Sequence, residues 1–532
     1  MKSHNDKALL KVLAAVMFVA TFAGFETSYA VYRADSDTGA GRLDIIENMR
    51  RVARENEPTA EQKKLLGEMK DMYGKLNKPY DPFNPPEGEQ VPTAFEGDDL
   101  TYDQITGEFV AKGKVHIVQL DGHSFDAPGD EGEITGNTRR QEINIDGKAQ
   151  VLQYPIKKGE QLSKITVEGY RTRYNYGTKM GTMESAKGKV DRQYITGKRF
   201  EFYPNRVVVY DGTVTRCSAN KPDYHESAKK IIIWPNDRMY LYDVKVWIGN
   251  AVLYKKKYME KDISPGAENV EYPRVGYSKS DGFWIKQRVN TPLIPRINLL
   301  TDLYANTKQG VRSKTELAWA IPHYTAKVAY GFYEDGDDNW IKKKPSFITQ
   351  YNNHFGGLPL SYVVRYESGH WEKVRSSGNN FESTHTEYNF ELNHDIIVLP
   401  ANYFLLMGVG YQIVKETYND STNKGFSYGT TLLKWFDERW AAYTGYNYSR
   451  VNANNSLFDY NTADYSQRGE AGVSYRLTKN DRFVAGYSYD CKKKTLRDID
   501  YYWFRDLHCS QLIVRYRVKR HSWNVSWEFT PW

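Results

Sequence analysis

The sequence predicts an all-β chain in which a β-rich domain precedes a transmembrane β-barrel. Two observations favour this class. Phe, Trp and Tyr make up 14% of the 532 residues, and in the C-terminal half they alternate with small or polar side chains. Tyr suits pleated strands that have one apolar and one wet side. A chain of this length has room for about two to four domains, and its net charge of +7 does not by itself identify a partner.

Residues 1–30 have the form of a secretory signal peptide. Three lysines precede the apolar stretch 12–25, and Ser28-Tyr29-Ala30 follows as a small-x-small cleavage site. An uncleaved anchor is the alternative, but the stretch is shorter than the ~18–20 residues that a membrane helix needs. We therefore expect cleavage after Ala30 and export to the periplasm or the outer membrane.

Residues 31–92 predict two helices and a linker. Apolar side chains recur at helical spacing between Leu43 and Ala53 and again between Leu65 and Met72, with Pro58 between the two stretches. We expect these stretches to pair as a small helical hairpin. Five prolines between positions 79 and 92 then predict a stiff, extended linker.

Residues 93–235 repeat a phrase in which a Gly-bearing turn leads into a β-branched strand, as in Thr106-Gly107 and Asp146-Gly147. Such repetition favours stacked strands, which would form a β-jellyroll or trough, followed by a junction over 236–269. Alternation gives each strand one apolar face, which is expected to hold Val115, Ile117, Ile143, Ile145, Ile165, Val167, Phe200, Phe202, Val207 and Val209. This face would form either a closed core or an open path for acyl chains.

Residues 270–532 predict the barrel. In the last strand Trp523, Val525, Trp527 and Phe529 alternate with polar residues. An aromatic face opposite a polar face is typical of a barrel with a lipid-facing belt and a wet lumen, and this length allows about 14–16 strands. The alternative is a soluble β-sandwich or propeller.

Short phrases in a specific order resemble one family, the LptD (OstA) family of lipopolysaccharide-assembly proteins. Its N-terminal domain is similar to Asp99–Asp103 and Ala111–Val115, and its link to the barrel is similar to Thr215-Arg216-Cys217 and Leu253-Tyr254. Gly276–Ser278 with Asp281–Phe283 resembles the family's first barrel hairpin, and Asp506–Cys509 resembles its C-terminal cysteine segment. The likeness covers about residues 93–290 and 500–530.

The resemblance implies a transport protein and no enzyme. An OstA-like jellyroll in the periplasm would receive lipopolysaccharide from a periplasmic bridge of LptA-like jellyrolls, and the barrel would insert it into the outer leaflet of the cell outer membrane. An LptE-like lipoprotein would plug the barrel, although this barrel is shorter than is usual in the family. The barrel-assembly machinery would insert the chain. We expect no cofactor, no metal and no nucleic acid. An apolar path is physically needed, because each exposed CH₂ costs about 0.8 kcal/mol.

The lipid would leave through a lateral gate between the first and last barrel strands. Proline has no backbone N–H to donate to a neighbouring strand, so it weakens the pairing of two strands. Pro273, Pro292 and Pro295 lie around the first two predicted strands. Trp523, Val525, Trp527 and Phe529 form the other side of the expected gate. The alternative is that these prolines only end strands.

The resemblance also implies a disulfide between Cys217 and Cys509, which would leave Cys491 free or as an alternative partner. Three unpaired thiols are the other possibility, since the redox state of the compartment is not known from the sequence.

Two other classes of outer-membrane barrel are the alternatives: an enzyme, such as a lipase or protease, and a passive porin. Neither explains the β-rich domain at 93–235. Gly425–Gly429 fits the G-x-S-x-G pattern, but a nucleophile elbow needs a strand-to-helix turn. Here the pattern is predicted to begin a barrel strand.

Overall fold

The computed structural model describes residues 38–76, 79–87, 89–157, 160–161, 163–263, 272–294, 296–334, 340–374, 381–450, 458 and 466–529. The predicted signal peptide and Pro295 lie outside these residues. Two compact units form, one from residues up to 53 together with 270–530, and the other from residues 54–269. No helix in the described ranges has the length and apolar character needed to span a membrane.

Three helical segments precede the strands, namely η1 (Ala40–Arg42), α2 (Leu43–Asn56) and α3 (Ala60–Gly74). Thr59 caps α3 in a reciprocal capping box with Gln62, which is the local reason for the break at Pro58. The predicted hairpin is wrong, because the two helices belong to different units. Leu65 of α3 packs on Val118, Leu152 and Tyr154 of the second unit, whereas α2 packs on the barrel.

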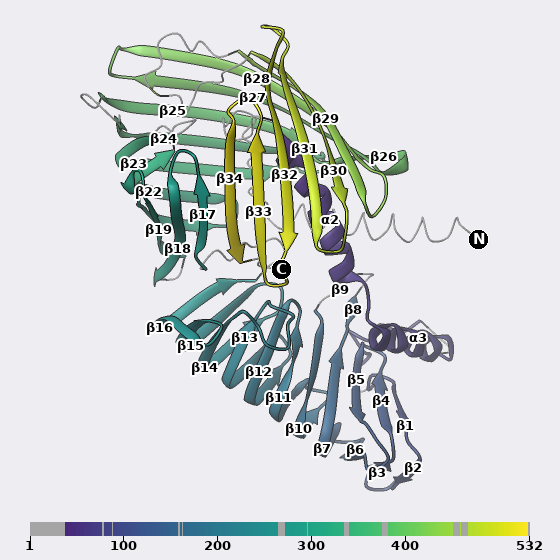
Figure 1. Ribbon diagram of the computed structural model, residues 1–532. Helices are drawn as coiled ribbons and strands as arrows, with labels where there is room; N and C mark the ends of the chain where they lie inside the picture. Colours follow the sequence, from purple (N-terminus) through teal and green to yellow (C-terminus); the bar gives the residue numbers. More distant parts are fainter. Residues whose placement is uncertain are drawn as a thin grey trace. The chain divides into compact units, whose positions relative to one another are not determined.

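The second unit is a 14-stranded antiparallel sheet with a separate small β8–β9 hairpin (Figure 1). Its strands are β1 (Thr93–Glu96), β2 (Asp99–Tyr102), β3 (Glu108–Lys112), β4 (Val115–Gln119), β5 (His123–Ala127), β6 (Glu133–Asn137), β7 (Glu142–Gln153), β8 (Ile156–Lys157), β9 (Glu160–Gln161), β10 (Ile165–Asn175), β11 (Met180–Val190), β12 (Gln193–Tyr203), β13 (Arg206–Thr215), β14 (Tyr224–Trp234), β15 (Arg238–Ile248) and β16 (Ala251–Asp262). The sequence predicted a separate junction over residues 236–269. Residues 238–262 instead continue this sheet as β15 and β16.

Several long strands of this sheet carry an irregularity near their middle. Arg171, Ser185, Asp211 and Asp243 have positive φ angles of 45° to 53° inside β10, β11, β13 and β15. The β10–β11 register shifts on both sides of Tyr170. Bulges of this kind bend and twist a strand, so the strands of the sheet bend at these points.

The barrel consists of β17 (Arg274–Ser278), β18 (Gly282–Ile294), β19 (Ile297–Asn306), β20 (Gly310–Val311), β21 (Lys314–Ile321), β22 (Tyr324–Glu334), β23 (Trp340–His354), β24 (Leu360–Val374), β25 (Phe381–His394), β26 (Ile397–Leu399), β27 (Tyr403–Glu416), β28 (Ser421–Trp435), β29 (Trp440–Arg450), β30 (Gln467–Arg476), β31 (Asp481–Asp490), β32 (Thr495–Asp506), β33 (Ser510–Arg517) and β34 (Ser522–Phe529). A short helical turn, η2 (Pro400–Asn402), lies between β26 and β27. Neighbouring strands pair antiparallel, and β34 pairs with β17 to close the ring.

Two of the eighteen strand segments in the described ranges are short pieces: β20 shares its partner β19 with β21, and β26 shares its partner β27 with β25. Sixteen full strands therefore form the barrel, which lies within the predicted range of about 14–16. The first hairpin also forms where the sequence predicts it, with Ser278 opposite Gly282.

Candidate functional sites in the barrel and the sheet

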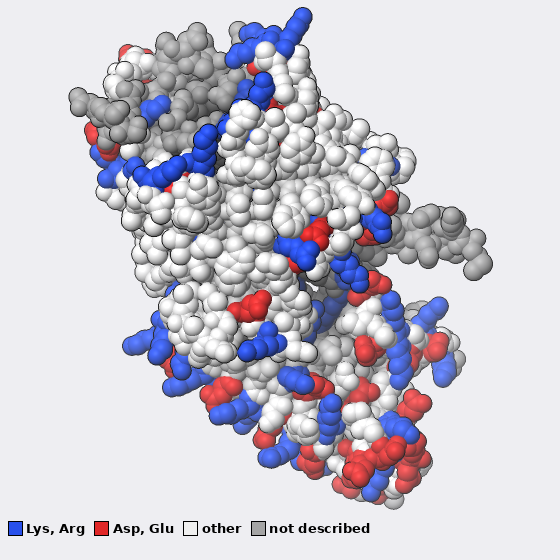
Figure 2. All heavy atoms as spheres, in the orientation of Figure 1, with Lys and Arg blue, Asp and Glu red and all other residues white. Residues whose placement is uncertain are grey.

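Side chains on the barrel strands alternate between an apolar outer face and a charged inner face. Exposed apolar residues on the outer face include Phe283, Val364, Tyr388, Phe390, Tyr411, Phe483 and Tyr501. Figure 2 shows a broad uncharged surface across the barrel strands, with Lys and Arg at its margins. A closed barrel with this belt spans a membrane, and bacterial barrels of this type lie in the outer membrane.

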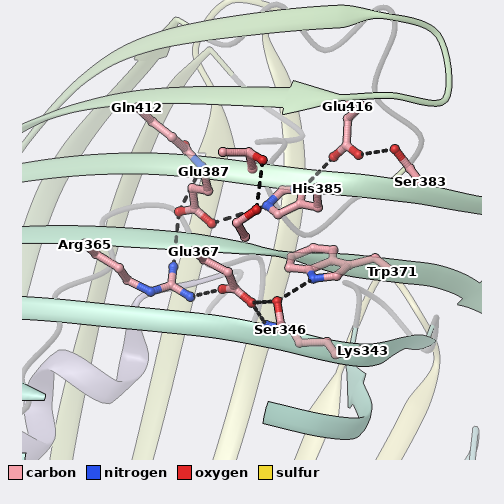
Figure 3. Close-up of polar contacts among 12 residues, drawn as sticks. Lys343, Ser346, Arg365, Glu367, Trp371, Ser383, His385, Glu387, Gln412 and Glu416 are labelled. Atoms are coloured by element: carbon pink, nitrogen blue, oxygen red, sulfur yellow. Dashed lines mark hydrogen bonds and ion pairs between the residues drawn. The ribbon is translucent and has the colours of Figure 1, made fainter. Parts of the chain in front are cut away.

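The inner face of β23, β24, β25 and β27 carries a buried network of charged residues (Figure 3). Glu367 accepts hydrogen bonds from Lys343, Arg365 and Ser346, and the Ser346 hydroxyl lies 2.9 Å from the carboxylate. Arg365 also lies 3.1 Å from Glu387. Each charge has a partner of opposite sign, as burial requires.

His385 extends this network on β25. Its Nδ1 lies 2.6 Å from Glu416, and its ring stacks on Trp371 with ring centroids 3.6 Å apart. Phe458 contacts both rings edge-on. Ser383 donates a 2.8 Å hydrogen bond to Glu416. The carboxylate thus lies between the serine and the histidine, whereas a nucleophilic triad needs the imidazole in the middle. The network therefore has the geometry of a structural cluster.

The G-x-S-x-G pattern lies inside a regular strand. Ser427 belongs to β28, pairs with Gly410 of β27, and donates its hydroxyl hydrogen bond to the Gly410 carbonyl at 3.2 Å. There is no strand-to-helix turn at this position, which agrees with the prediction of a barrel strand.

The seam between β17 and β34 is short. Four residue pairs join these strands, from Val275 opposite Trp527 to Ser278 opposite Asn524, whereas eight pairs join β33 to β34. The pairing of β17 with β18 stops at Lys286, so Gln287 to Ile294 of β18 pair with β19 alone among the described strands.

Of the predicted gate residues, Val525 and Trp527 pair directly with β17, and Pro295 lies outside the described residues. Pro273 directly precedes β17, and Pro292 lies in the part of β18 that extends beyond β17. Trp523 is exposed, whereas Val525, Trp527 and Phe529 are half-buried. A Cβ atom on Gly276 would lie 2.3 Å from the Trp284 ring and 2.5 Å from the Val525 carbonyl oxygen. Gly276 is thus a point of close approach between the first and last strands.

All ten residues predicted for the apolar face of the sheet are buried, at 4% exposure or less. Cross-strand pairs bring several of them together: Phe200 lies opposite Val209, and Phe202 lies opposite Val207. Burial of each such side chain contributes about 1.5–3 kcal/mol to folding. The predicted face therefore exists as one buried apolar layer.

An open cleft of about 550 Å³ lies on the same unit between the ends of β7, β10, β11 and β12. Its apolar lining includes Ile143, Tyr174 and Phe202, and its charged lining consists of Glu142, Arg173, Arg199 and Glu201. Ile143 and Phe202, two of the predicted apolar residues, thus border the cleft, although both side chains are buried.

Cys217 and Cys509 are joined in a disulfide, which is the pair that the family resemblance implies. Cys491 is a free thiol and is half-buried.

Sequence reasoning missed two features of the barrel interior. The first is the charged network of Figure 3, whose signal was present as Arg365, Glu367, His385 and Glu387 at alternate positions of two aromatic-rich strands. The second is the position of α2. Ile46 and Met49 of α2 are buried against Leu433 and Trp435 of β28, and these contacts are not predictable from the spacing of apolar residues in the helix.

No protein-family model matches this chain, and no curated protein matches it. Solved structures of outer-membrane barrels are similar to it at low identity. BamA from Haemophilus ducreyi lacking POTRA domains 1–3 is 9% identical, with 51% of this chain and 71% of that chain covered and a TM-score of 0.33. OmpT, an outer membrane protein of Vibrio cholerae, is 13% identical (48% and 93% covered, TM-score 0.25). OprD from Pseudomonas aeruginosa is 8% identical (73% and 88% covered, TM-score 0.22).

Proposed function

We propose that this chain transports lipopolysaccharide to the outer leaflet of the outer membrane. The observation that carries the proposal is that one chain combines a membrane barrel with a long sheet whose buried apolar layer borders a cleft lined by charged residues. An amphiphile with several acyl chains needs an apolar surface while it crosses water, because its transfer cost rises with every exposed CH₂. A porin or a barrel enzyme has no use for such a sheet.

The short seam supports a lateral exit from the barrel. Separation of β17 from β34 breaks four residue pairs, which is the smallest number at any junction between full strands in the described barrel. The exit would place acyl chains directly in the bilayer, while the sugars pass through the charged lumen.

The free edge of the sheet supports a bridge partner. All four residues of β2 are exposed, and β2 pairs with β3 alone among the described strands. An unpaired edge can accept a strand from another β-sheet. An LptA-like jellyroll would extend the apolar layer in this way.

Depletion of the chain, followed by an assay of lipopolysaccharide at the cell surface, tests the proposal. We expect newly made lipopolysaccharide to stay in the inner membrane or the periplasm. A Phe202→Glu variant should show the same defect, because a carboxylate interrupts the apolar layer where it meets the cleft. Lys198→Glu on the same strand is the matched control, since this lysine is exposed. Normal surface lipopolysaccharide after depletion would disprove the proposal.

A further inference from the structure

The N-terminal segment 38–53 lies inside the barrel. It contacts Ala441, Tyr443, Val484 and other residues at alternate strand positions, whereas the positions between them, such as Trp440 and Phe483, are exposed on the outer face. In Figure 1 α2 runs behind the yellow strands β31 and β32. The helix therefore occupies lumenal space.

Apolar contacts hold one side of this segment. Leu43, Ile46 and Met49 are buried against Phe404, Leu406, Leu433 and Trp435. An isolated helix of 14 residues is marginal in water, so the barrel wall stabilises α2 in place.

Three successive charged residues of the segment form ion pairs with residues of opposite charge on the barrel strands β30 and β31. Arg42 lies 2.5 Å from Glu470 of β30. Asp44 lies 2.5 Å from Arg482 of β31, and Glu47 forms an ion pair with Arg476 of β30.

The ends of the segment are held by polar contacts as well. Arg50, near the end of α2, donates hydrogen bonds to the backbone carbonyls of Asp437 and Trp440. The Thr38 hydroxyl donates to Asp500 at 2.8 Å. Complementary contacts of this kind define one docked position for the whole segment.

Glycines on the wall leave room for the segment. A Cβ atom on Gly486 would lie 3.0 Å from the Thr38 Cβ and 3.1 Å from the Ala40 Cβ. A Cβ atom on Gly445 would lie 2.8 Å from an Arg42 nitrogen. Around Gly486 the three nearest atoms all belong to the segment, so a side chain as large as leucine there would displace the segment and leave the strands paired.

From these contacts we infer that residues 38–53 are an intramolecular plug that narrows the lumen, and that its carboxylates occupy an anion site formed by Arg476 and Arg482. A barrel of sixteen strands encloses an aqueous channel, and a helix with its side chains is about 10–12 Å wide. The plug therefore blocks much of the channel. Its removal leaves the two guanidinium groups without Asp44 and Glu47, so the open lumen would favour anions such as phosphate groups.

Single-channel conductance of the purified chain in a planar bilayer tests the plug. Three variants act on it: deletion of residues 38–53, the double variant Asp44→Asn/Glu47→Gln, and Gly486→Leu. We expect severalfold larger conductance in the deletion, more frequent large openings in the other two, and a shift toward anion selectivity in the double variant. Glu57→Gln is the matched control, because its carboxylate contacts the exposed Lys63 at 3.3 Å.

A reversible lock completes the test. Ala40→Cys/Gly486→Cys in a Cys491→Ser background should form a disulfide that abolishes the large openings until reductant is added. Heat-modifiable migration on gels shows which variants have a folded barrel, so a deletion that fails to fold leaves the point variants and the lock to decide. Folded variants that conduct like the unmodified chain would overturn the inference. The bilayer contains no glycolipid, so this result is independent of the proposed transport function.

Discussion

The guanidinium of Arg42 lies 2.5 Å from the carboxylate of Glu470 inside the barrel. One residue is near the start of the described chain and the other is on β30, and the side chain of Glu470 is fully buried. Asn447 holds the same two groups, since it accepts a hydrogen bond from Arg42 and donates one to Glu470. The pair thus fixes the N-terminal segment to the lumenal wall.

Loss of this pair should destabilise the folded barrel. We expect Arg42→Ala to lower the free energy of unfolding by about 1–3 kcal/mol. The loss is smaller than for a buried carboxylate left without any cation, because Arg468 remains 3.2 Å from Glu470. The measurement is the temperature at which the folded band disappears from gels in detergent. Lys63→Ala, which removes an exposed ion pair, is the control and should leave this temperature unchanged. An equal loss in both variants would contradict the role assigned to Arg42.

Gly276 should be intolerant of larger side chains. Gly276→Val places the added Cβ closer than van der Waals contact to the Trp284 ring and the Val525 carbonyl oxygen. Overpacking of this kind costs about 1–3 kcal/mol. The expected result is a weaker β17–β34 seam, which faster proteolysis near residues 274–278 would detect. Gly356→Val is the control, because no atom lies within 4 Å of its added Cβ. Equal proteolysis of the two variants would show that the seam is not tightly packed.

The attachment of α3 to its sheet should depend on pH. His116 lies between Asp126 at 2.5 Å and Glu68 of α3 at 2.9 Å. Burial lowers the pKa of His116, but the hydrogen bonds and charges of the two carboxylates outweigh burial and raise it above its usual value of 6.5. The stabilisation is therefore complete below 6.5 and is lost as pH rises through the raised pKa.

Hydrogen exchange of residues 60–74, corrected for intrinsic rates, measures this effect. Protection should fall as the pH rises above 6.5 and through the raised pKa of His116, and His116→Gln should remove the change. Lys64→Gln keeps the imidazole while removing an exposed ion pair with Glu68, so it should retain the pH dependence. Constant protection across this range in the unmodified chain would contradict the prediction.

Thiol counting tests the disulfide. The denatured chain should expose one reactive thiol, that of Cys491, before reduction and three after reduction. Cys217→Ser should expose two thiols without reductant. Three thiols in the oxidised, unmodified chain would show that Cys217 and Cys509 are not bonded.

Local patterns allowed the strands to be predicted, while contacts between distant segments escaped prediction. Alternation around Trp523 to Phe529 identifies a barrel strand, because the period of a strand is two and a membrane accepts only one kind of face. The spacing of Leu43, Ile46 and Met49 identifies a helix with an apolar face. It does not identify what covers that face. The partners Leu433 and Trp435 lie on β28, and apolar residues at alternate positions are expected in any barrel strand, so they do not indicate that a helix packs on them.

The limit of the sheet was misplaced for a similar reason. Residues 238–262 are rich in tyrosine, as the barrel strands also are, with Tyr240, Tyr242, Tyr254 and Tyr258, so composition alone did not assign β15 and β16 to the first sheet. Backbone pairing made that assignment, with Tyr242 opposite Tyr258.

Site-specific photo-crosslinking at Ile117, Ile145 and Phe202 in growing cells tests the transport proposal most directly. These side chains are buried in the apolar layer of the sheet, so a photoreactive residue there reaches only molecules that enter the layer. We expect adducts with lipopolysaccharide at these three positions and none at the exposed Lys198. Crosslinks confined to the protein itself, in cells that are making lipopolysaccharide, would mean that the layer is a closed core and that the chain carries no glycolipid.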